Sequence, residues 1–132
     1  MPEPLDLISV NHISRLTKSV DAALAFYRDV MGFRQVWRPD LTYPGAWLTN
    51  DRVMVHLIEG DKTQGEGEIL SRSDHLAFDV ADIDECERRL QAHGIAYDRK
   101  VQRGSGTVQI FFNDPDGNHI ELGTYPSIKE LN

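Results

Sequence analysis

The apolar and polar positions in the first half of the chain follow two different periods. Residues 7 to 15 alternate with a period of two, which predicts a strand. Ser19 stands where it can cap a following helix, and Gly32 is a natural stop for that helix. The apolar positions that recur at helical spacing between them are Val20, Leu24, Tyr27 and Met31. Three β-like runs follow, near residues 33 to 38, 46 to 49 and 52 to 58, and Asn50-Asp51 is suited to a tight turn.

The second half of the chain repeats this order of elements. A strand is expected over 74 to 80 and a helix over 82 to 93, followed by β-like runs near 95 to 101, 107 to 113 and 118 to 123. His12 and His75, on the first strand of each half, lie 63 residues apart in a chain of 132. Such self-similarity indicates two copies of one unit. We therefore predict an α+β fold of two tandem βαβββ modules.

The domain organisation follows from the repeat and the length. A chain of this length holds one domain, residues 1–132, and not a catalytic domain with a separate regulatory one. The two internal modules are expected at about 7–60 and 73–124. The acidic, glycine-containing stretch 61–72 has no clear periodicity and is interpreted as the linker between them.

Composition and charge narrow the class of protein. An apolar fraction of 40% is ordinary for a globular chain. The net charge of −7 opposes binding to nucleic acid and to anionic membranes. No apolar run is long enough to span a membrane, and the N-terminal residues do not resemble a signal peptide. We expect a cytoplasmic protein with no nucleic-acid or membrane partner.

The single cysteine of this chain limits the chemistry that thiols could provide. Cys86 is the single cysteine, so neither an intramolecular disulfide nor a zinc site with two cysteines can form within one chain. It falls on the apolar stripe of the predicted helix 82 to 93, and we interpret it as a core residue and not as a catalytic thiol. Any metal ion must then be bound mainly by histidines and carboxylates.

Strand alternation places four such side chains at related positions. His12 and His75 lie on the first strands of the two modules, and His56 and Glu121 lie on the last strands. If each module curls into a half-barrel, its first and last strands are neighbours, and all four groups face one cavity. Three imidazoles and one carboxylate suit one divalent ion per site: Zn, Ni, Co, Mn or Fe(II). Glu121 would offset part of the ion's charge and serve as a base when it dissociates from it.

The other histidines and the large aromatic residues receive different interpretations. His93 is read as a residue at a helix C-terminus, where a partly positive ring is favourable. His119 shares the face of Glu121 and is a candidate contact for a metal ligand or the substrate. Trp37, Trp47 and Phe111 are interpreted as core packing, with a ligand-binding cleft as the alternative.

Several blocks of sequence resemble the vicinal oxygen chelate superfamily, which includes glyoxalase I, methylmalonyl-CoA epimerase, extradiol dioxygenases, fosfomycin-resistance proteins and bleomycin-binding proteins. The blocks are Val10-Asn11-His12-Ile13, Ala25-Phe26-Tyr27-Arg28-Asp29-Val30-Met31-Gly32-Phe33, Asp74-His75-Leu76-Ala77-Phe78 and Phe112-Asn113-Asp114-Pro115-Asp116-Gly117-Asn118-His119-Ile120-Glu121-Leu122. The resemblance covers nearly the whole chain. It implies half-barrels around a metal-binding cavity and metal ligands at His12, His56, His75 and Glu121.

The resemblance also carries expectations about assembly and ligation. Small members of the superfamily usually pair as homodimers, which implies metal sites shared between subunits. The family position that corresponds to His56 varies in identity and does not always ligate. Without His56, the set of His12, His75 and Glu121 is the two-histidine, one-carboxylate arrangement also used in Fe(II) oxygen chemistry.

At some positions this sequence lacks, or offers substitutes for, the residues that individual members of the superfamily use for their reactions. Leu16 and Gly60 replace the Arg and Asn that contact glutathione in bacterial-type glyoxalase I, and alternation sends Arg15 to the face opposite His12. The loop 103–106, with Ser105, is a candidate phosphonate loop or a plain hairpin connection. For dioxygenase chemistry, His119 and Tyr43 or Tyr125 are available.

The functional hypothesis is a metal-dependent, glyoxalase-like lyase or isomerase. Its small-molecule substrate would chelate the ion through adjacent oxygens, with Glu121 as the catalytic base. The alternatives are an Fe(II) extradiol-type dioxygenase, and a thiol transferase or ligand-sequestering resistance protein of the same superfamily.

Overall fold

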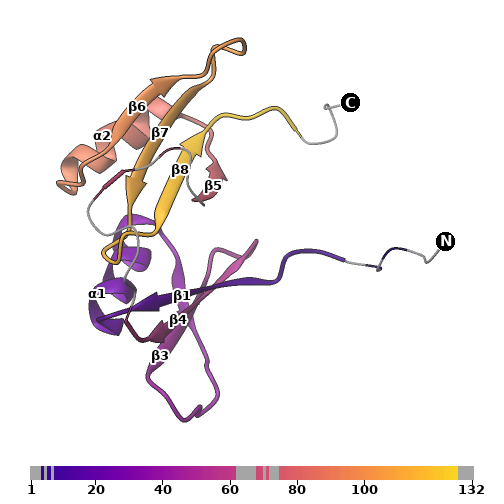
Figure 1. The fold of residues 1–132 in the computed structure, drawn as a ribbon, viewed down its shortest axis with the longest axis vertical. Coiled ribbons are helices and arrows are strands. Elements are labelled where there is room, and N and C mark those ends of the chain that lie inside the picture. Colours follow the sequence, from indigo (N-terminus) through magenta and orange to yellow (C-terminus); the bar gives the residue numbers. More distant parts are fainter. Residues whose placement is uncertain are drawn as a thin grey trace. The chain divides into compact units, whose positions relative to one another are not determined.

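The structure is a computed structural model that describes residues 4, 6, 8–61, 68, 69, 71 and 75–127. Its chain divides into two compact units, Met1–Gly60 and Asp61–Asn132, each with its own sheet and helical segment (Figure 1). Most of the predicted linker 61–72, and the predicted start of the second module at residue 73, lie outside the described residues.

The first unit is a four-stranded sheet with one helical segment. Its elements in chain order are β1 (His12–Thr17), α1 (Val20–Ala25), η1 (Phe26–Val30), β2 (Arg34–Val36), β3 (Gly45–Thr49) and β4 (Met54–Glu59). The strands lie in the order β1-β4-β3-β2, with β1 parallel to β4 and the other pairs antiparallel. The first and last strands are therefore neighbours, and α1 packs on β3 and β4.

The second unit repeats this topology. Its elements are β5 (His75–Asp79), α2 (Ile83–Ala92), β6 (Asp98–Val101), β7 (Val108–Asn113) and β8 (His119–Gly123). The strand order is β5-β8-β7-β6, again with the first and last strands parallel and adjacent (Figure 1). The predicted fold, two tandem βαβββ modules, is confirmed.

The opening strand is shorter than the alternation predicted. Residue 7 lies outside the described residues, and β1 begins at His12, because β4 is its pairing partner and the ladder with β4 starts at the pair His12 and Met54. The side chains of Ile8 and Val10 are 99% and 71% exposed. The alternation of apolar and polar residues continues into a segment that pairs with no described strand of this unit. The period alone therefore overestimates the length of the strand at its N-terminal end.

The first helical segment is also not the single α-helix that was predicted. Ser19 caps α1 by accepting a hydrogen bond from the Ala22 N–H, as expected. The last turn widens into a π-helix, η1, in which the Met31 N–H donates to the Phe26 carbonyl. Phe26 and Tyr27, the first two residues of η1, are both buried, at 7% and 1% exposure.

Helix α2 agrees with the expected bounds and ends. The Asp82 carboxylate accepts from the Glu85 N–H at its start, and His93 is the residue that ends it. Cys86 is half-buried on this helix, and burial raises the pKa of its thiol, which opposes a role as a nucleophile. Among the described residues, no helix is long and apolar enough to span a membrane.

Each unit has an apolar core on the helix-facing side of its sheet. In the first unit Leu48, Val55 and Leu57 are 0 to 1% exposed, on the two strands against which α1 packs. In the second unit Ile110, Phe112 and Ile120 are equally buried. Because strand side chains alternate, the residues between these core positions point to the opposite face of each sheet. That opposite face carries the candidate metal ligands.

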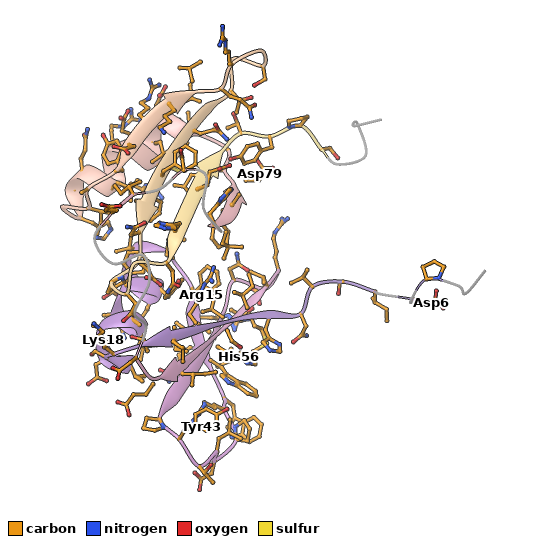
Figure 2. The ribbon with its side chains drawn as sticks, viewed as in Figure 1. Asp6, Arg15, Lys18, Tyr43, His56 and Asp79 are labelled. Carbon is orange, nitrogen blue, oxygen red and sulfur yellow. The ribbon has the colours of Figure 1, made fainter. Side chains whose placement is uncertain are left out.

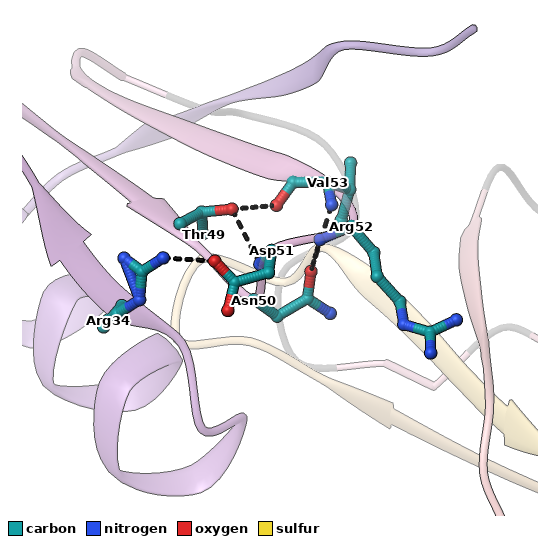
Figure 3. Close-up of polar contacts among 6 residues, drawn as sticks. All are labelled: Arg34, Thr49, Asn50, Asp51, Arg52 and Val53. Atoms are coloured by element: carbon teal, nitrogen blue, oxygen red, sulfur yellow. Dashed lines mark hydrogen bonds and ion pairs between the residues drawn. The ribbon is translucent and has the colours of Figure 1, made fainter.

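The connection between β3 and β4 is a tight turn held by side chains of its own residues (Figure 3). Oδ1 of Asn50 accepts hydrogen bonds from the N–H groups of Arg52 and Val53, both at 3.0 Å. The Thr49 hydroxyl donates to the Val53 carbonyl and accepts from the Asp51 N–H. Asp51 has a φ of 72°, in the left-handed region that Asp and Asn tolerate in such turns. The turn sets the β3–β4 register that brings Trp47 opposite His56.

Substituting Asn50→Ala should lower the free energy of unfolding by about 1–2 kcal/mol, because two backbone N–H groups lose their acceptor. The matched control is Arg34→Met, which removes an exposed ion pair with Asp51 and should change stability by about 0.5 kcal/mol or less. Urea denaturation measures both. Equal effects would contradict the role given to the Asn50 side chain.

A second turn, between β7 and β8, is organised by the buried carboxylate of Asp114. Its Oδ1 accepts from the N–H groups of Asp116 and Asn118, at 2.9 and 2.8 Å. Its Oδ2 accepts from the Asn118 side-chain amide at 2.7 Å, and Gly117 takes the positive φ of 81° that closes the turn. The Asp-Pro-Asp-Gly-Asn block therefore fixes how the chain enters β8, the strand that carries Glu121.

Substituting Asp114→Ala should cost about 3 kcal/mol of unfolding free energy, since the donors of Asn118 and Asp116 would stay buried without an acceptor. Asp114→Asn should cost less, because the amide oxygen still accepts. Asp40→Ala, in an exposed loop of the first unit, serves as the control and should be near neutral. Chemical denaturation followed by circular dichroism would measure the series, and a neutral Asp114→Ala would refute the argument.

Candidate metal site

The second unit brings His75 and Glu121 into direct contact. In the parallel ladder of β5 and β8, Ala77 pairs with Glu121 and His75 pairs with His119. His75 and Glu121 thus share one face on adjacent strands, and Nε2 of His75 lies 3.2 Å from Oε1 of Glu121. Glu121 is only 6% exposed. A buried carboxylate is costly unless polar groups solvate it, so its other contacts matter.

The second oxygen of that carboxylate accepts two hydrogen bonds. The Gln109 amide donates to Oε2 of Glu121 at 3.2 Å, and the Tyr125 hydroxyl donates to the same oxygen. Burial, and then the hydrogen bond to Glu121, raises the pKa of Tyr125, so its hydroxyl keeps its proton at neutral pH. Glu121 is held by Oε2 and presents Oε1 toward His75.

Tyr125 reaches Glu121 because position 123 has no side chain. A Cβ built on Gly123 would lie 2.5 Å from Cζ of Tyr125 and 2.6 Å from its hydroxyl oxygen. The backbone N–H of Tyr125 also donates to Oδ1 of Asp79, at 3.1 Å, which ties the segment after β8 to the end of β5. Asp79 is labelled in Figure 2. The ring therefore lies across β8, directly over the glycine.

The first unit carries a row of three stacked rings on the sheet face opposite its core. Trp47 pairs with His56 across β3 and β4, and their rings stack at a centroid distance of 4.1 Å and an angle of 4°. The ring of His12 on β1 stacks on the other side of His56, at 3.9 Å and 13°. His56, labelled in Figure 2, is thus sandwiched between an indole and a second imidazole.

The two imidazoles of this row have different surroundings. Nδ1 of His12 lies 2.9 Å from Oδ1 of Asn11, a contact that leaves Nε2 as the atom with a free electron pair when Nδ1 donates. Nε2 of His56 is buried and has no hydrogen-bond partner among the described residues. Burial, then the positive charges of His12 and Arg38, lowers the pKa of His56 and favours the neutral ring.

The four predicted ligands therefore form two pairs, one in each unit: His12 with His56, and His75 with Glu121. Within the described part of the chain, no three His, Cys, Asp or Glu side chains gather as a group that could hold an ion. The residues fit a divalent ion best in the second unit, because two ligands on one ion are typically about 3 Å apart. In the first unit, the nitrogen atoms available to an ion would be Nε2 of His56, which has no partner among the described residues, and Nε2 of His12.

The remaining candidates have other positions. His119 is half-buried on the face of His75 and Glu121, and its Nδ1 lies 2.7 Å from Oδ1 of Asn113. The Trp37 side chain is 81% exposed, so its interpretation as core packing is wrong.

Two features set aside on sequence grounds can also be placed. Arg15 pairs with Leu57 on the core-side face, as alternation predicted. The hydroxyl of Ser105 is bonded to Gln102 and Thr107 within its own loop, as in a plain hairpin connection.

The contacts of Gln109 and Tyr125 with Glu121 were missed at the sequence level. The alternation of β7 could have indicated Gln109, because it pairs with Gly123, two residues after Glu121 on β8. Tyr125 lies beyond the end of β8, where no period specifies direction, and so no sequence pattern gives its contact.

Comparison with known proteins identifies the family. The family model described as the Glyoxalase/Bleomycin resistance protein/Dioxygenase superfamily matches residues 9–122. The chain belongs to this superfamily.

Two relatives and one solved structure of the same fold illustrate the range of the match. The chain is 38% identical to "Glyoxylase I 4" of Arabidopsis thaliana over 125 residues, 90% of this chain and 72% of the relative. It is 31% identical to the uncharacterized protein YaeR of Escherichia coli, over 89% of this chain and 97% of the relative. Among solved structures, a mutant of the fosfomycin resistance protein FosX of Listeria monocytogenes, complexed with Mn(II) and 1S,2S-dihydroxypropylphosphonic acid, has a TM-score of 0.79 at 19% identity, over 95% of this chain and 98% of that one.

Substituting Gly123→Ala should displace the Tyr125 ring from Glu121, at a cost of about 1–3 kcal/mol in unfolding free energy. In the Tyr125→Ala background, Gly123→Ala should cost less than it does in the parent chain, because the ring that the new methyl group would meet is absent. Tyr125→Phe separates the hydroxyl from the ring, since it keeps the packing and loses one bond to the carboxylate. Thermal unfolding measures the cycle, and strict additivity of the two substitutions would show that a methyl group at position 123 does not meet the Tyr125 ring.

Proposed function

We propose that this chain is a metal-dependent enzyme of the superfamily: a glyoxalase-like lyase or isomerase whose small substrate chelates a divalent ion through adjacent oxygens. Glu121 is the catalytic base. The candidate donors to the ion are His75 and Glu121 of the second module and the imidazoles of His12 and His56 of the first. The superfamily resemblance implies a homodimer, and we propose that the metal site is shared between its subunits.

The observation that carries this proposal is the contact between His75 and Glu121. A carboxylate with 6% exposure, with one oxygen 3.2 Å from an imidazole and the other held by Gln109 and Tyr125, is an unusual arrangement for a purely structural residue. The relative named "Glyoxylase I 4" supports the assignment to this class of enzyme.

The two carboxylate oxygens of Glu121 have different contacts and, in this proposal, different roles. Gln109 and Tyr125 hold Oε2 and fix the plane of the carboxylate. Oε1 is left to bind an ion or to take a proton from a carbon next to a carbonyl group. Because the Tyr125 hydroxyl stays protonated, it continues to donate to Oε2 in either role. A divalent ion, when bound, would draw electron density from the substrate's oxygens and make that proton more acidic.

Protein purified without chelator should contain about one divalent ion per chain, and the Glu121→Gln variant should lose turnover by about a thousandfold or more while keeping its fold. Elemental analysis measures the ion, and the activity is assayed on hemithioacetals formed from a 2-oxoaldehyde with glutathione or another thiol. Glu59→Gln, an exposed carboxylate at the end of the matching strand β4, is the control and should keep its activity.

The identity of the ion separates this proposal from its alternatives. Zn, Ni or Co with hemithioacetal turnover supports the lyase or isomerase. Fe(II) with oxygen uptake on a catechol would replace it with an extradiol-type dioxygenase, and transfer of a thiol to an epoxide would replace it with a thiol transferase. Absence of metal both on purification and on titration would refute the enzyme assignment and favour a ligand-sequestering protein.

A further inference from the structure

Arg38 is a half-buried cation on the sheet face of the first unit that carries the stacked rings. Val36 lies opposite Trp47 across β2 and β3, so alternation places Arg38 on the same face, opposite Gly45. A Cβ built on Gly45 would lie 2.9 Å from Nη2 of Arg38 and 3.2 Å from its Cζ. The guanidinium group therefore lies directly over β3, at a position that has no side chain.

The positive charge of Arg38 has no carboxylate partner among the described residues. Its Nη2 donates to the Tyr43 carbonyl at 2.9 Å, and its buried Nε has no hydrogen-bond partner in the described part of the chain. Arg34, which alternation places on the same face, is paired with Asp51. A partly desolvated guanidinium group bonded to one neutral acceptor is unfavourable, because the charge has lost water and gained no anion.

The contacts of Arg38 hold its charge in place without neutralising it. Its Cζ lies 5.0 Å from the centroid of the Tyr43 ring, a residue labelled in Figure 2. With the Tyr43 carbonyl, this ring fixes the guanidinium group from two sides. A guanidinium group oriented in advance offers a carboxylate the paired N–H donors that bind it best. One uncompensated positive charge matches a singly charged anion.

The ring of Trp47 lies next to this cation along β3. Gly45, which lies under the guanidinium group, and Trp47 are two residues apart on one face, a separation of about 6–7 Å. His56 covers one face of the indole, and no other described ring stacks on it. A carboxylate bound by Arg38 can therefore place a planar apolar group against the indole, a contact that is favourable for flat rings.

We propose that Arg38 and Trp47 form a binding site for a small-molecule carboxylate, in which the guanidinium group binds the carboxylate and the indole contacts a planar apolar group beside it. The site lies within the first unit and needs no metal ion. It shares a sheet face with His12 and His56. The substrate of the enzyme therefore carries such a carboxylate, a step that rests on the proposed function.

Titration of the metal-free, full-length protein with sodium benzoate and sodium acetate tests the proposal. Proton–nitrogen NMR spectra follow the Nε–H signal of Arg38, which is assigned by its absence from Arg38→Gln. Both anions should shift this signal, and benzoate should bind about threefold or more tightly than acetate because its ring contacts the indole. Benzoate should also shift the indole N–H signal of Trp47. Sodium chloride at the same ionic strength should leave both signals in place.

Variants separate recognition by Arg38 from the general attraction of an anion to a cation. Followed by the Trp47 signal, Arg38→Gln should weaken benzoate binding about tenfold or more, and Arg38→Lys, which keeps the charge and loses the paired donors, about threefold or more. Arg34→Gln is the matched control, because it removes an arginine of the same face that is already ion-paired, and it should bind within about twofold of the parent chain. Trp47→Leu should bind benzoate and acetate alike.

Benzoate affinity that is unchanged in Arg38→Gln, or signals that move equally with sodium chloride, would overturn the proposal. Tighter binding of inorganic phosphate than of benzoate would also overturn it, in favour of a phosphate ligand. Thermal unfolding confirms that each variant is folded, and Arg38→Lys and the parent titrations decide the question if Arg38→Gln does not fold. Benzoate binding through Arg38 in a protein without turnover would refute the proposed function and leave this binding site in place.

Discussion

The parallel pairing of the first and last strand in each unit is the constraint on which the candidate site depends. His75 and Glu121 are 46 residues apart in the sequence, and they touch because β5 and β8 are neighbours with Ala77 opposite Glu121. A shift of one residue in this ladder would turn Glu121 toward the apolar core. The Asp114 turn leads the chain into β8. It therefore contributes to the position of Glu121 in the candidate site as well as to the stability of the fold.

The two units have the same strand topology, but the side chains on their last strands are stabilised in different ways. In the second, a buried carboxylate is stabilised by polar partners, with Gln109 and Tyr125 on one oxygen and His75 beside the other. In the first, the corresponding last strand carries His56, whose faces are covered by aromatic rings. Hydrogen bonds orient a carboxylate and stacking orients an imidazole, so the repeated fold supports a division of roles between its halves.

The sequence predicted those parts of the fold that local rules decide. Ser19 caps its helix, and β8 was expected within one residue of its observed bounds, because capping and period-two alternation act over a few residues. The first strand and first helix were less accurate. β1 starts where β4 can pair with it, and the helix widens into η1, whose Phe26 and Tyr27 are buried in the core. Both outcomes depend on partners distant in sequence.

The candidate site divides in the same way. The sequence by itself determined the residue types, their strands and the faces they share, since alternation on β1, β4, β5 and β8 is a local property. Only the tertiary structure decided which of them touch, because contacts depend on register, on ring orientation and on the chain beyond a strand's end. The 3.2 Å contact of His75 with Glu121, the stacking of His12 on His56, and the reach of Tyr125 over Gly123 are decided there, by packing between strands that no local pattern specifies.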